Sequence, residues 1–315
     1  MELRQLEYFM VLSRELHFTK AADRLGITQP TLSHQIKALE DEIGMPLFDR
    51  LGKKIAITEA GFILAEQCKT IFSALDYAKD QINELQQVRG GSISIAALPG
   101  ELTDLVSTLL FDFHKNYPDV KVRIISSDEI TELILLNEID FGVTIATADN
   151  TAGDERIRSI PLYEDEFFLV VSHDHPLATR EDVRFSELTS LPLILFPESH
   201  QCRKLLNQTC VSIQSDLHPK IETSSIDTLF EFVKSGLGLT VVSKTLLDLH
   251  MYNDLISIPI VQPRMNREVS LVYRRDKFIG YGARNFIQLL TTEIIKLRFP
   301  MSEDSKQQIE RLTSR

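Results

Sequence analysis

The chain has 315 residues, of which 43% are apolar and 25% charged, as expected for a soluble globular protein of about two domains. Its apolar runs are shorter than the ~20 residues that cross a bilayer. No basic-then-apolar leader opens the chain, and three dispersed cysteines argue against a disulfide scaffold or a zinc finger. We therefore expect a cytoplasmic protein without a membrane span. The net charge is −11, yet residues 1–58 are neutral and the excess acid lies in residues 59–315, so an N-terminal module can still bind phosphate.

The first 44 residues predict three helices, over 3–16, 20–25 and 29–42, from apolar residues at helical spacing. The residues that suit the helix ends are two N-caps and two terminating glycines: Thr19, Thr28, Gly26 and Gly44. The second and third helices are joined by only three residues, which is a helix-turn-helix pattern.

The third helix has two distinct faces. One is an apolar stripe that packs on the other helices: Leu32, Ile36, Leu39 and Ile43. The other carries small polar groups and one cation near its N-terminal end: Gln29, Pro30, Thr31, Ser33, His34 and Lys37. Such side chains can hydrogen-bond base edges in the major groove, although an ordinary solvated face has a similar composition. Two short strands then follow over 46–50 and 53–58, and Arg50, Lys53 and Lys54 would make this hairpin a basic wing over the DNA backbone.

Residues 1–58 resemble the N-terminal domain of the LysR-type transcriptional regulators. The motifs that carry the resemblance are Leu6-x-x-Phe9, Phe18-Thr19-x-Ala21-Ala22-x-x-Leu25, Thr28-Gln29-Pro30-x-Leu32-Ser33-x-Gln35-Ile36-x-x-Leu39-Glu40, Gly44-x-Pro46-Leu47-Phe48-x-Arg50 and Thr58-x-Ala60-Gly61. The resemblance implies that Gln29, Pro30, Ser33, His34 and Lys37 enter the groove of double-stranded DNA, and that Arg50 and Lys53 touch the backbone. The complete set of candidate DNA-binding residues is Thr19, Thr28, Gln29, Pro30, Thr31, Ser33, His34, Lys37, Arg50 and Lys53.

A long helix is predicted from Glu59 to about Val88, because this stretch has no Pro and a single Gly. Apolar residues repeat along it with alternating spacings of four and three: Leu64, Cys68, Ile71, Leu75, Ala78, Ile82 and Leu85. Such a seam favours pairing between chains, although a long helix packed on its own domain would look similar. Members of the family use this helix to dimerise, and the resemblance also implies tetramers.

After a hinge at Arg89–Ser92 the pattern changes to alternating strands and helices, which indicates an α/β fold. The expected strands are 92–97, 120–126, 141–147, 167–172, 193–196, 239–243 and 269–274. The expected helices are 102–116, 130–137, 203–213, 226–235 and 284–297. Family landmarks recur here: Arg89-Gly90, Phe113-x-x-x-Tyr117-Pro118, Asp140-Phe141-Gly142, His175-Pro176-Leu177-Ala178 and Gly236-Leu237-Gly238-Leu239.

The resemblance implies an effector domain of two α/β subdomains, similar to a periplasmic binding protein. We expect subdomain I over 91–162 and 268–300, subdomain II over 163–267, crossings near Ile160–Asp165 and Pro263–Glu268, and a polar tail over 301–315. The domains are thus a winged helix-turn-helix (1–58), a linker helix (59–90), an effector domain (91–300) and the tail.

Two such subdomains bind small molecules between them, where strands end and helices begin. The candidate effector-binding residues share these positions: Pro99, Gly100, Thr103, Ser126, Ser127, Thr144, Ser199, His200, Arg203, Ser224 and Ser225. Hydroxyls at helix N-termini also serve as ordinary caps. We hypothesise an anionic metabolite anchored by Ser127, Ser199 and Arg203, although Glu101, Asp128 and Glu198 in the same loops would suit a cationic or neutral ligand.

A rival function is thiol-based redox sensing by Cys202 and Cys210, which lie where peroxide-sensing relatives carry their reactive pair. The two cysteines are eight residues apart on a predicted helix, so the helix would have to unwind before they could form a disulfide. An enzyme is disfavoured, because the chain lacks phosphate-loop, H-E-x-x-H and G-x-S-x-G motifs and its His173/His175 pair lies in a family landmark. We expect a transcriptional regulator with no cofactor and no metal site. Its expected partners are operator DNA, a small effector, RNA polymerase and further copies of itself, often as an activator.

Overall fold

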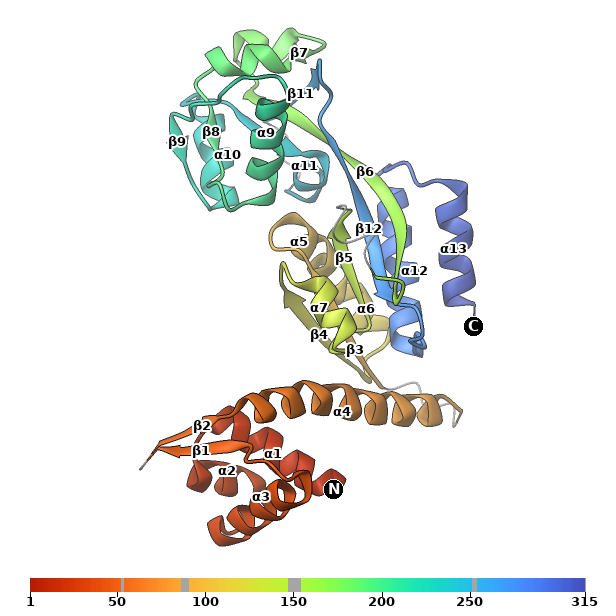
Figure 1. The fold of residues 1–315 in the computed structure, drawn as a ribbon. Coiled ribbons are helices and arrows are strands. Elements are labelled where there is room, and N and C mark those ends of the chain that lie inside the picture. Colours follow the sequence, from red (N-terminus) through yellow and green to blue (C-terminus); the bar gives the residue numbers. More distant parts are fainter. Residues whose placement is uncertain (52–53, 86–90, 147–153, 251–253, 315) are drawn as a thin grey trace. The chain divides into compact units, whose positions relative to one another are not determined.

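The computed structural model describes residues 1–51, 54–85, 91–146, 154–250 and 254–314. The chain forms two compact units, one of Met1–Ile82 with Leu136–Glu138 and one of Asn83–Leu135 with Ile139–Arg315. Each is described by itself (Figure 1). Within the described residues no helix combines the length and apolarity needed to cross a membrane.

The first unit opens with helices α1 (Leu3–Glu15), α2 (Phe18–Leu25) and α3 (Gln29–Ile43). Their apolar faces meet in one core that includes Phe9, Leu12, Leu32, Ile36 and Leu39. Thr28 caps α3 and accepts from Thr31 N at 3.4 Å, and Gly26 and Gly44 end their helices with positive φ, as predicted.

Two details of these helices differ from the sequence prediction. The N-cap of α2 is His17, whose Nδ1 accepts from Lys20 N, so Thr19 lies inside the helix. The helix begins earlier because the His17 ring offers an acceptor that the prediction did not consider. Ile43, placed in the apolar stripe, is exposed, since the stripe's buried part ends at Leu39 one turn earlier.

A hairpin and the long helix complete the unit. Strands β1 (Phe48–Leu51) and β2 (Lys54–Ile57) pair antiparallel, and α4 spans Glu59–Leu85. Lys53 and the predicted helix end at Val88 lie outside the described residues. Gly61 in α4 approaches the hairpin so closely that an added Cβ would stand 2.3 Å from Leu47 O. This contact fixes α4 on the hairpin and explains a glycine in the first turn of a helix.

The second unit carries most of the strands. They are β3 (Gly91–Ala97), β4 (Val120–Ser126), β5 (Phe141–Ile145), β6 (Ile157–Ser172), β7 (Val183–Arg184), β8 (Ile194–Leu195), β9 (Ile221–Glu222), β10 (Thr240–Ser243), β11 (Leu255–Val261) and β12 (Asn266–Arg274). Its helices are α5 (Glu101–Thr108), α6 (Leu110–Asn116), α7 (Ile130–Leu135), α9 (Gln201–Ser212), α10 (Ile226–Lys234), α11 (Lys244–His250), α12 (Tyr281–Lys296) and α13 (Glu303–Thr313), with 3-10 helices at Pro176–Thr179 and Phe185–Ser190. The alternation confirms the α/β class.

Two hydrophobic cores lie in this unit. The first is built from buried residues between Ile93 and Tyr163 and between Val269 and Ile309, and the second from those between Phe167 and Met265. We call them core I and core II. The strand β6 runs through both: it pairs with β12 from Ile157 to Glu166 and with β10 and β11 beyond it. The crossings expected near 160–165 and 263–268 are this paired ribbon, with the strand order β4-β3-β5-β12-β6-β11-β7 (Figure 1).

Several predicted elements have different bounds. The helix expected over 102–116 is two helices, and the Thr108 hydroxyl donates to Asp104 O at the break, a local bond that competes with the helix ladder. The hinge placed at Arg89–Ser92 is partly strand, because Gly91 and Ser92 belong to β3, while Arg89 and Gly90 lie outside the described residues. Residues 301–315 hold α13, whose Ile309 is buried in core I.

Candidate DNA-binding and effector sites

The polar face of α3 is exposed. Gln29, Pro30, Thr31, His34 and Lys37 are exposed and Ser33 is half-buried, while Leu32, Ile36 and Leu39 hold the opposite face in the core. Thr28 is engaged in capping, with its hydroxyl 2.8 Å from that of Thr31. The helix N-terminus thus presents small donors and acceptors on a rigid support, which suits a base edge or a phosphate.

The predicted wing is only partly described. Arg50 and Lys54 lie in β1 and β2, and their side chains, together with Lys53, are outside the described part of the molecule. Their contact with DNA therefore stays a prediction from the sequence, as does that of Thr19, an exposed residue of α2.

The seam predicted on α4 divides into two halves. Cys68 is 0% exposed within the N-terminal core, and Leu64 and Ile71 pack against that core. Further along, Ala78 is exposed and Ile82 is 55% exposed, whereas Leu75 is intermediate and the Leu85 side chain is not described. Phe62 and Ile63, which the seam did not include, are 60% and 62% exposed. The heptad repeat therefore serves the chain's own core over its first half.

A buried ion cluster occupies the region where the paired strands pass between the two cores. The Arg267 guanidinium on β12 bonds Glu101 at the start of α5, and its Nη2 lies 2.9 Å from Asp165 Oδ2 on β6. Asp165 Oδ1 also accepts from Thr245 N at 3.0 Å and from the Thr245 hydroxyl at 2.9 Å. The two carboxyl side chains are 2% and 0% exposed, so the charges are fully removed from water.

Burial and charge act in opposite directions on these carboxyls. Burial alone would raise the pKa of Glu101, but the adjacent Arg267 outweighs it and the pKa is lowered. For Asp165, burial dominates and the pKa is raised despite Arg267 and Thr245. Within the described residues Glu101 Oε2 and Arg267 Nη1 have no hydrogen-bond partner. The cluster therefore keeps one acceptor and one charged donor unsatisfied.

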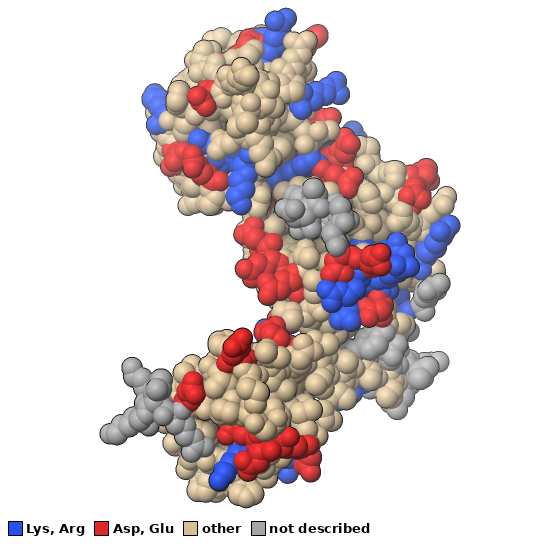
Figure 2. All heavy atoms as spheres, viewed as in Figure 1, with Lys and Arg blue, Asp and Glu red and all other residues tan. Residues whose placement is uncertain are grey.

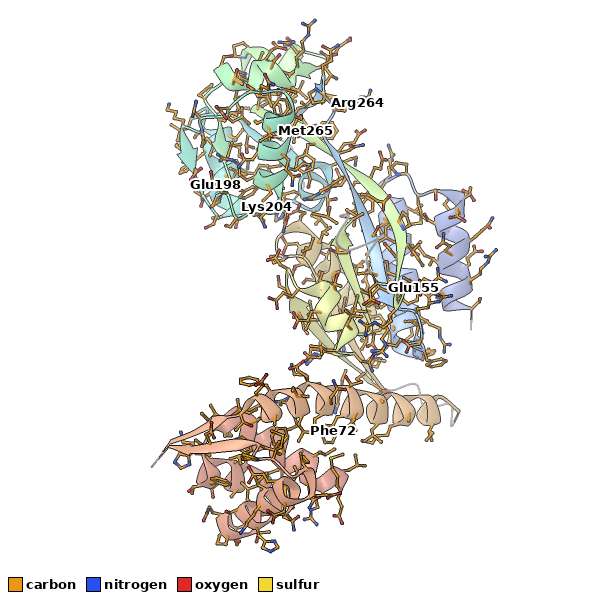
Figure 3. All side chains as sticks on the ribbon, viewed as in Figure 1. Phe72, Glu155, Glu198, Lys204, Arg264 and Met265 are labelled. Atoms are coloured by element: carbon orange, nitrogen blue, oxygen red, sulfur yellow. The ribbon has the colours of Figure 1, made fainter. Side chains whose placement is uncertain are left out.

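The loops around α5 and α9 meet beside this cluster. A Cβ on Gly100 would stand 3.3 Å from His200 Nε2, so this glycine, at φ +98°, permits a close approach. Gln201 Nε2 donates to Asp128 Oδ1 at 2.8 Å. Burial lowers the pKa of His200, whose ring stacks on Phe196 at 4.0 Å. Figure 3 labels Glu198 and Lys204, which flank the N-terminal turn of α9.

The structure brings some predicted effector residues together and separates others. Gly100 and His200 face each other, and Thr103 Oγ1 lies 3.1 Å from Ser126 Oγ. Ser127 and Ser225 cap backbone N–H groups, as a purely structural role would require. Three further members lack a described partner across the cores: Pro99, Ser199 and Ser224 are exposed. Thr144 is buried at the end of β5.

Arg203 is held inside core II. Its guanidinium donates to Asn207 Oδ1 at 2.9 Å and to Glu222 Oε1 at 3.1 Å, and its side chain is 5% exposed. Sequence reasoning selected Arg203 and missed Arg267, the guanidinium that meets both crossing strands. The sequence did hold one signal for Arg267. It lies in the predicted second crossing, near 263–268, and Asp165 lies in the first, so the two residues face each other when the crossings pair.

The cysteines of α9 are buried thiols. Cys202 lies with Sγ 3.5 Å from Glu101 Oε1, and both burial and that carboxylate raise its pKa. Cys210 is buried too, and burial followed by Asp216 raises its pKa. Eight residues of helix separate them by about 12 Å along the axis. Neither environment stabilises a thiolate. Among the described residues no cluster of His, Cys, Asp and Glu could hold a metal ion.

Comparisons with known proteins agree with this architecture. Residues 3–62 match the family described as bacterial regulatory helix-turn-helix protein, lysR family, and residues 86–294 match the LysR substrate binding domain. The chain belongs to the LysR family of transcriptional regulators. It is therefore a DNA-binding regulator with an effector-binding domain, and its relatives are regulators rather than enzymes.

Three similar proteins illustrate the range of the LysR family. The HTH-type transcriptional regulator YbhD of Escherichia coli is 28% identical, covering 92% of this chain and 90% of the relative. The hydrogen peroxide-inducible genes activator of Dickeya chrysanthemi is 29% identical, covering 87% and 90%. The crystal structure of full-length CbnR complexed with its target DNA has a TM-score of 0.63 at 19% identity, covering 94% and 100%.

Proposed function

We propose that this LysR-family protein is a regulator controlled by a small anionic metabolite that binds where the two cores meet. The observation that carries the proposal is the buried Arg267, which ties α5 of core I to the crossing strands and keeps one charged donor without a partner among the described residues. An anion that bonded Arg267 would compete with Glu101, so it would favour one arrangement of the two cores over another.

The predicted anchors Ser127, Ser199 and Arg203 remain candidates, and we add His200 and Arg267 to them. His200 is suited to contact the effector because it approaches Gly100 across the junction. The change in the junction would reach DNA through the linker helix and a dimer. We propose that exposed residues of α4, with Phe62, Ile63 and Ile82 as its large apolar members, form that interface. We also propose that two such dimers form a tetramer and that the DNA-bound protein contacts RNA polymerase.

The effector proposal is tested by thermal unfolding of the full-length chain with a panel of small carboxylates. A ligand at a hundred times its dissociation constant stabilises the folded state by about 2.7 kcal/mol, which raises the unfolding temperature measurably. We expect at least one carboxylate to stabilise the chain, and we expect His200→Ala to lower the affinity for that carboxylate by about tenfold. His218→Ala is the matched control, because His218 is exposed in the same core's outer loop. If no carboxylate stabilises the wild-type chain, the anionic-effector proposal fails.

The second candidate function is redox sensing through Cys202 and Cys210. Similarity to a hydrogen peroxide-inducible activator favours it. The buried, protonated thiols and their separation on one helix oppose it. We expect the full-length chain, treated with excess hydrogen peroxide and then unfolded for labelling, to retain its three free thiols. Loss of two thiols in wild type, but not in Cys202→Ser, would instead make the redox function the leading one.

A further inference from the structure

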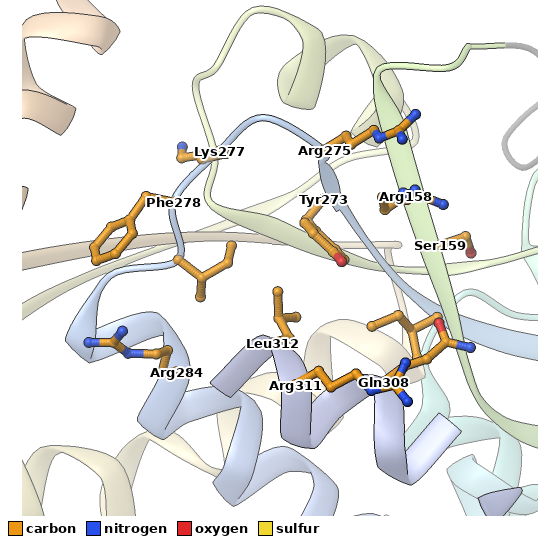
Figure 4. A pocket seen from close by; sticks show the side chains of 12 residues that line it. Arg158, Ser159, Tyr273, Arg275, Lys277, Phe278, Arg284, Gln308, Arg311 and Leu312 are labelled. Atoms are coloured by element: carbon orange, nitrogen blue, oxygen red, sulfur yellow. The ribbon is translucent and has the colours of Figure 1, made fainter. Parts of the chain in front are cut away.

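A pocket outside the junction of the two cores lies at one end of core I. Its volume is about 490 Å³, within the range of small-molecule sites. The lining comes from β6, from β12 and the segment after it, and from helices α12 and α13. Figure 4 shows Tyr273 in the middle of this lining, with Arg275 on one side, Leu312 and Arg311 of α13 on the other, and Arg284 beside Phe278.

The lining is strongly basic. Five of its side chains are cationic and none is acidic: Arg158, Arg275, Lys277, Arg284 and Arg311. This is unusual in a chain whose net charge is −11. Figure 2 shows Lys and Arg side chains gathered, with a few acidic ones between them, around that end of β6 and β12.

Three nearby acids form ion pairs, and one of them pairs with a cation of the lining, Lys277. Asp276 pairs with Arg274 at 2.7 Å, Asp154 pairs with Arg156 at 2.6 Å, and Asp140 pairs with Lys277 at 2.9 Å. No ion pair joins Arg158, Arg275 or Arg311 to any residue that the structure describes. These three exposed guanidinium groups face one cavity, so an anion bound there would relieve their mutual repulsion.

The floor of the pocket is apolar. Ile160 and Ile279 are buried in core I, and Tyr273, Phe278 and Leu312 are half-buried beside them. Burial raises the pKa of Tyr273, so the ring and its hydroxyl stay neutral. An apolar floor with arginines at its rim fits a ligand with an apolar body and a carboxylate or phosphate head. A guanidinium group can donate two parallel hydrogen bonds to two oxygens of such a head.

We propose that this pocket binds a second small ligand, an organic anion with a carboxylate or phosphate head on an apolar body. The bound ligand bridges α13 to β6 and β12 and holds the C-terminal helix against core I. The site shares no residue with the junction of the two cores, so it stands whether or not the effector proposal holds.

The test is titration calorimetry of the full-length chain with three probes that share one ring system: 2-naphthoate, 2-naphthyl phosphate and neutral 2-naphthalenemethanol. We expect at least one anion to bind with a dissociation constant below about 1 mM and the alcohol to bind at least tenfold more weakly. The double variant Arg275→Ala/Arg311→Ala removes two exposed arginines and should weaken anion binding by roughly tenfold or more.

The matched control is the double variant Arg264→Ala/Lys220→Ala. It removes two exposed cations from the surface around core II and should bind the anion as the wild type does. Hydrogen exchange gives a second readout, because the bound anion should slow exchange across α13 in wild type and in the control only. The proposal is overturned if neither anion binds, if the alcohol binds equally well, or if both double variants weaken binding alike. It is also overturned if the pocket variant weakens DNA binding and leaves anion binding unchanged, since the basic rim would then serve nucleic acid.

Discussion

Replacing Arg267 by alanine is expected to lower the free energy of unfolding by about 3–5 kcal/mol, the usual cost of breaking a buried ion pair from one side. The reason is the pair of carboxylates that Arg267 serves. Glu101 and Asp165 are both almost fully buried, and removal of the guanidinium leaves each without its cation. Urea unfolding of the full-length chain, followed by circular dichroism, measures the difference.

The control for this prediction lies three residues away. Arg264 is exposed, so Arg264→Ala should change the free energy of unfolding by no more than about 0.5 kcal/mol. If Arg267→Ala unfolds at the same urea concentration as Arg264→Ala, the ion cluster does not join the two cores in solution. The proposal that an anion controls their arrangement through Arg267 would then lose its physical basis.

His34→Ala should weaken binding to the protein's preferred DNA site by about 1–3 kcal/mol, or roughly 5- to 150-fold, and change non-specific binding little. His34 is exposed on α3 while Leu32 and Ile36 beside it are buried, so the helix should keep its fold without the imidazole. Fluorescence anisotropy at one fixed salt concentration, with the preferred site and a scrambled duplex, gives both affinities.

His114→Ala is the matched control, since it removes an exposed histidine from α6 in the other unit. It should bind both duplexes as wild type does. An equal loss on the two duplexes with His34→Ala would assign His34 to the DNA backbone and remove it from base recognition.

The sequence was most informative where a motif and a periodicity coincide. Thr28, Gly26 and Gly44 were assigned correctly because capping is local chemistry that a few neighbouring residues decide. The cap of α2 was wrong because His17 and Thr19 both offer an acceptor, and spacing alone does not choose between them. The seam on α4 stays a prediction as an interface between chains. Its first half packs on the chain's own core, and the sequence did not show this because a heptad repeat states which residues share a face, not which surface covers them.

The sites between distant segments could not be predicted in the same way. Glu101, Asp165 and Arg267 come from three separate elements, and only the register of β6 on β12 sets Arg267 opposite Asp165. The strand β6 spans 16 residues, although the apolar pattern predicts a strand only over 167–172, because charged residues in its earlier part pair through the backbone. Arg203 was selected on its charge and its place near a helix start, yet Glu222 from a short strand holds it inside core II.

Sequence-specific recognition through α3 is tested most directly by selection of binding sites from random DNA by the full-length wild-type chain. We predict enrichment of one motif with two related half-sites about one helical turn, or a multiple of it, apart, as a dimer with two α3 helices requires. With His34→Ala we predict relaxed preference at a base within each half-site. Recovery of DNA without any enriched motif, or of the same motif at the same strength from His34→Ala, would contradict sequence-specific recognition through α3.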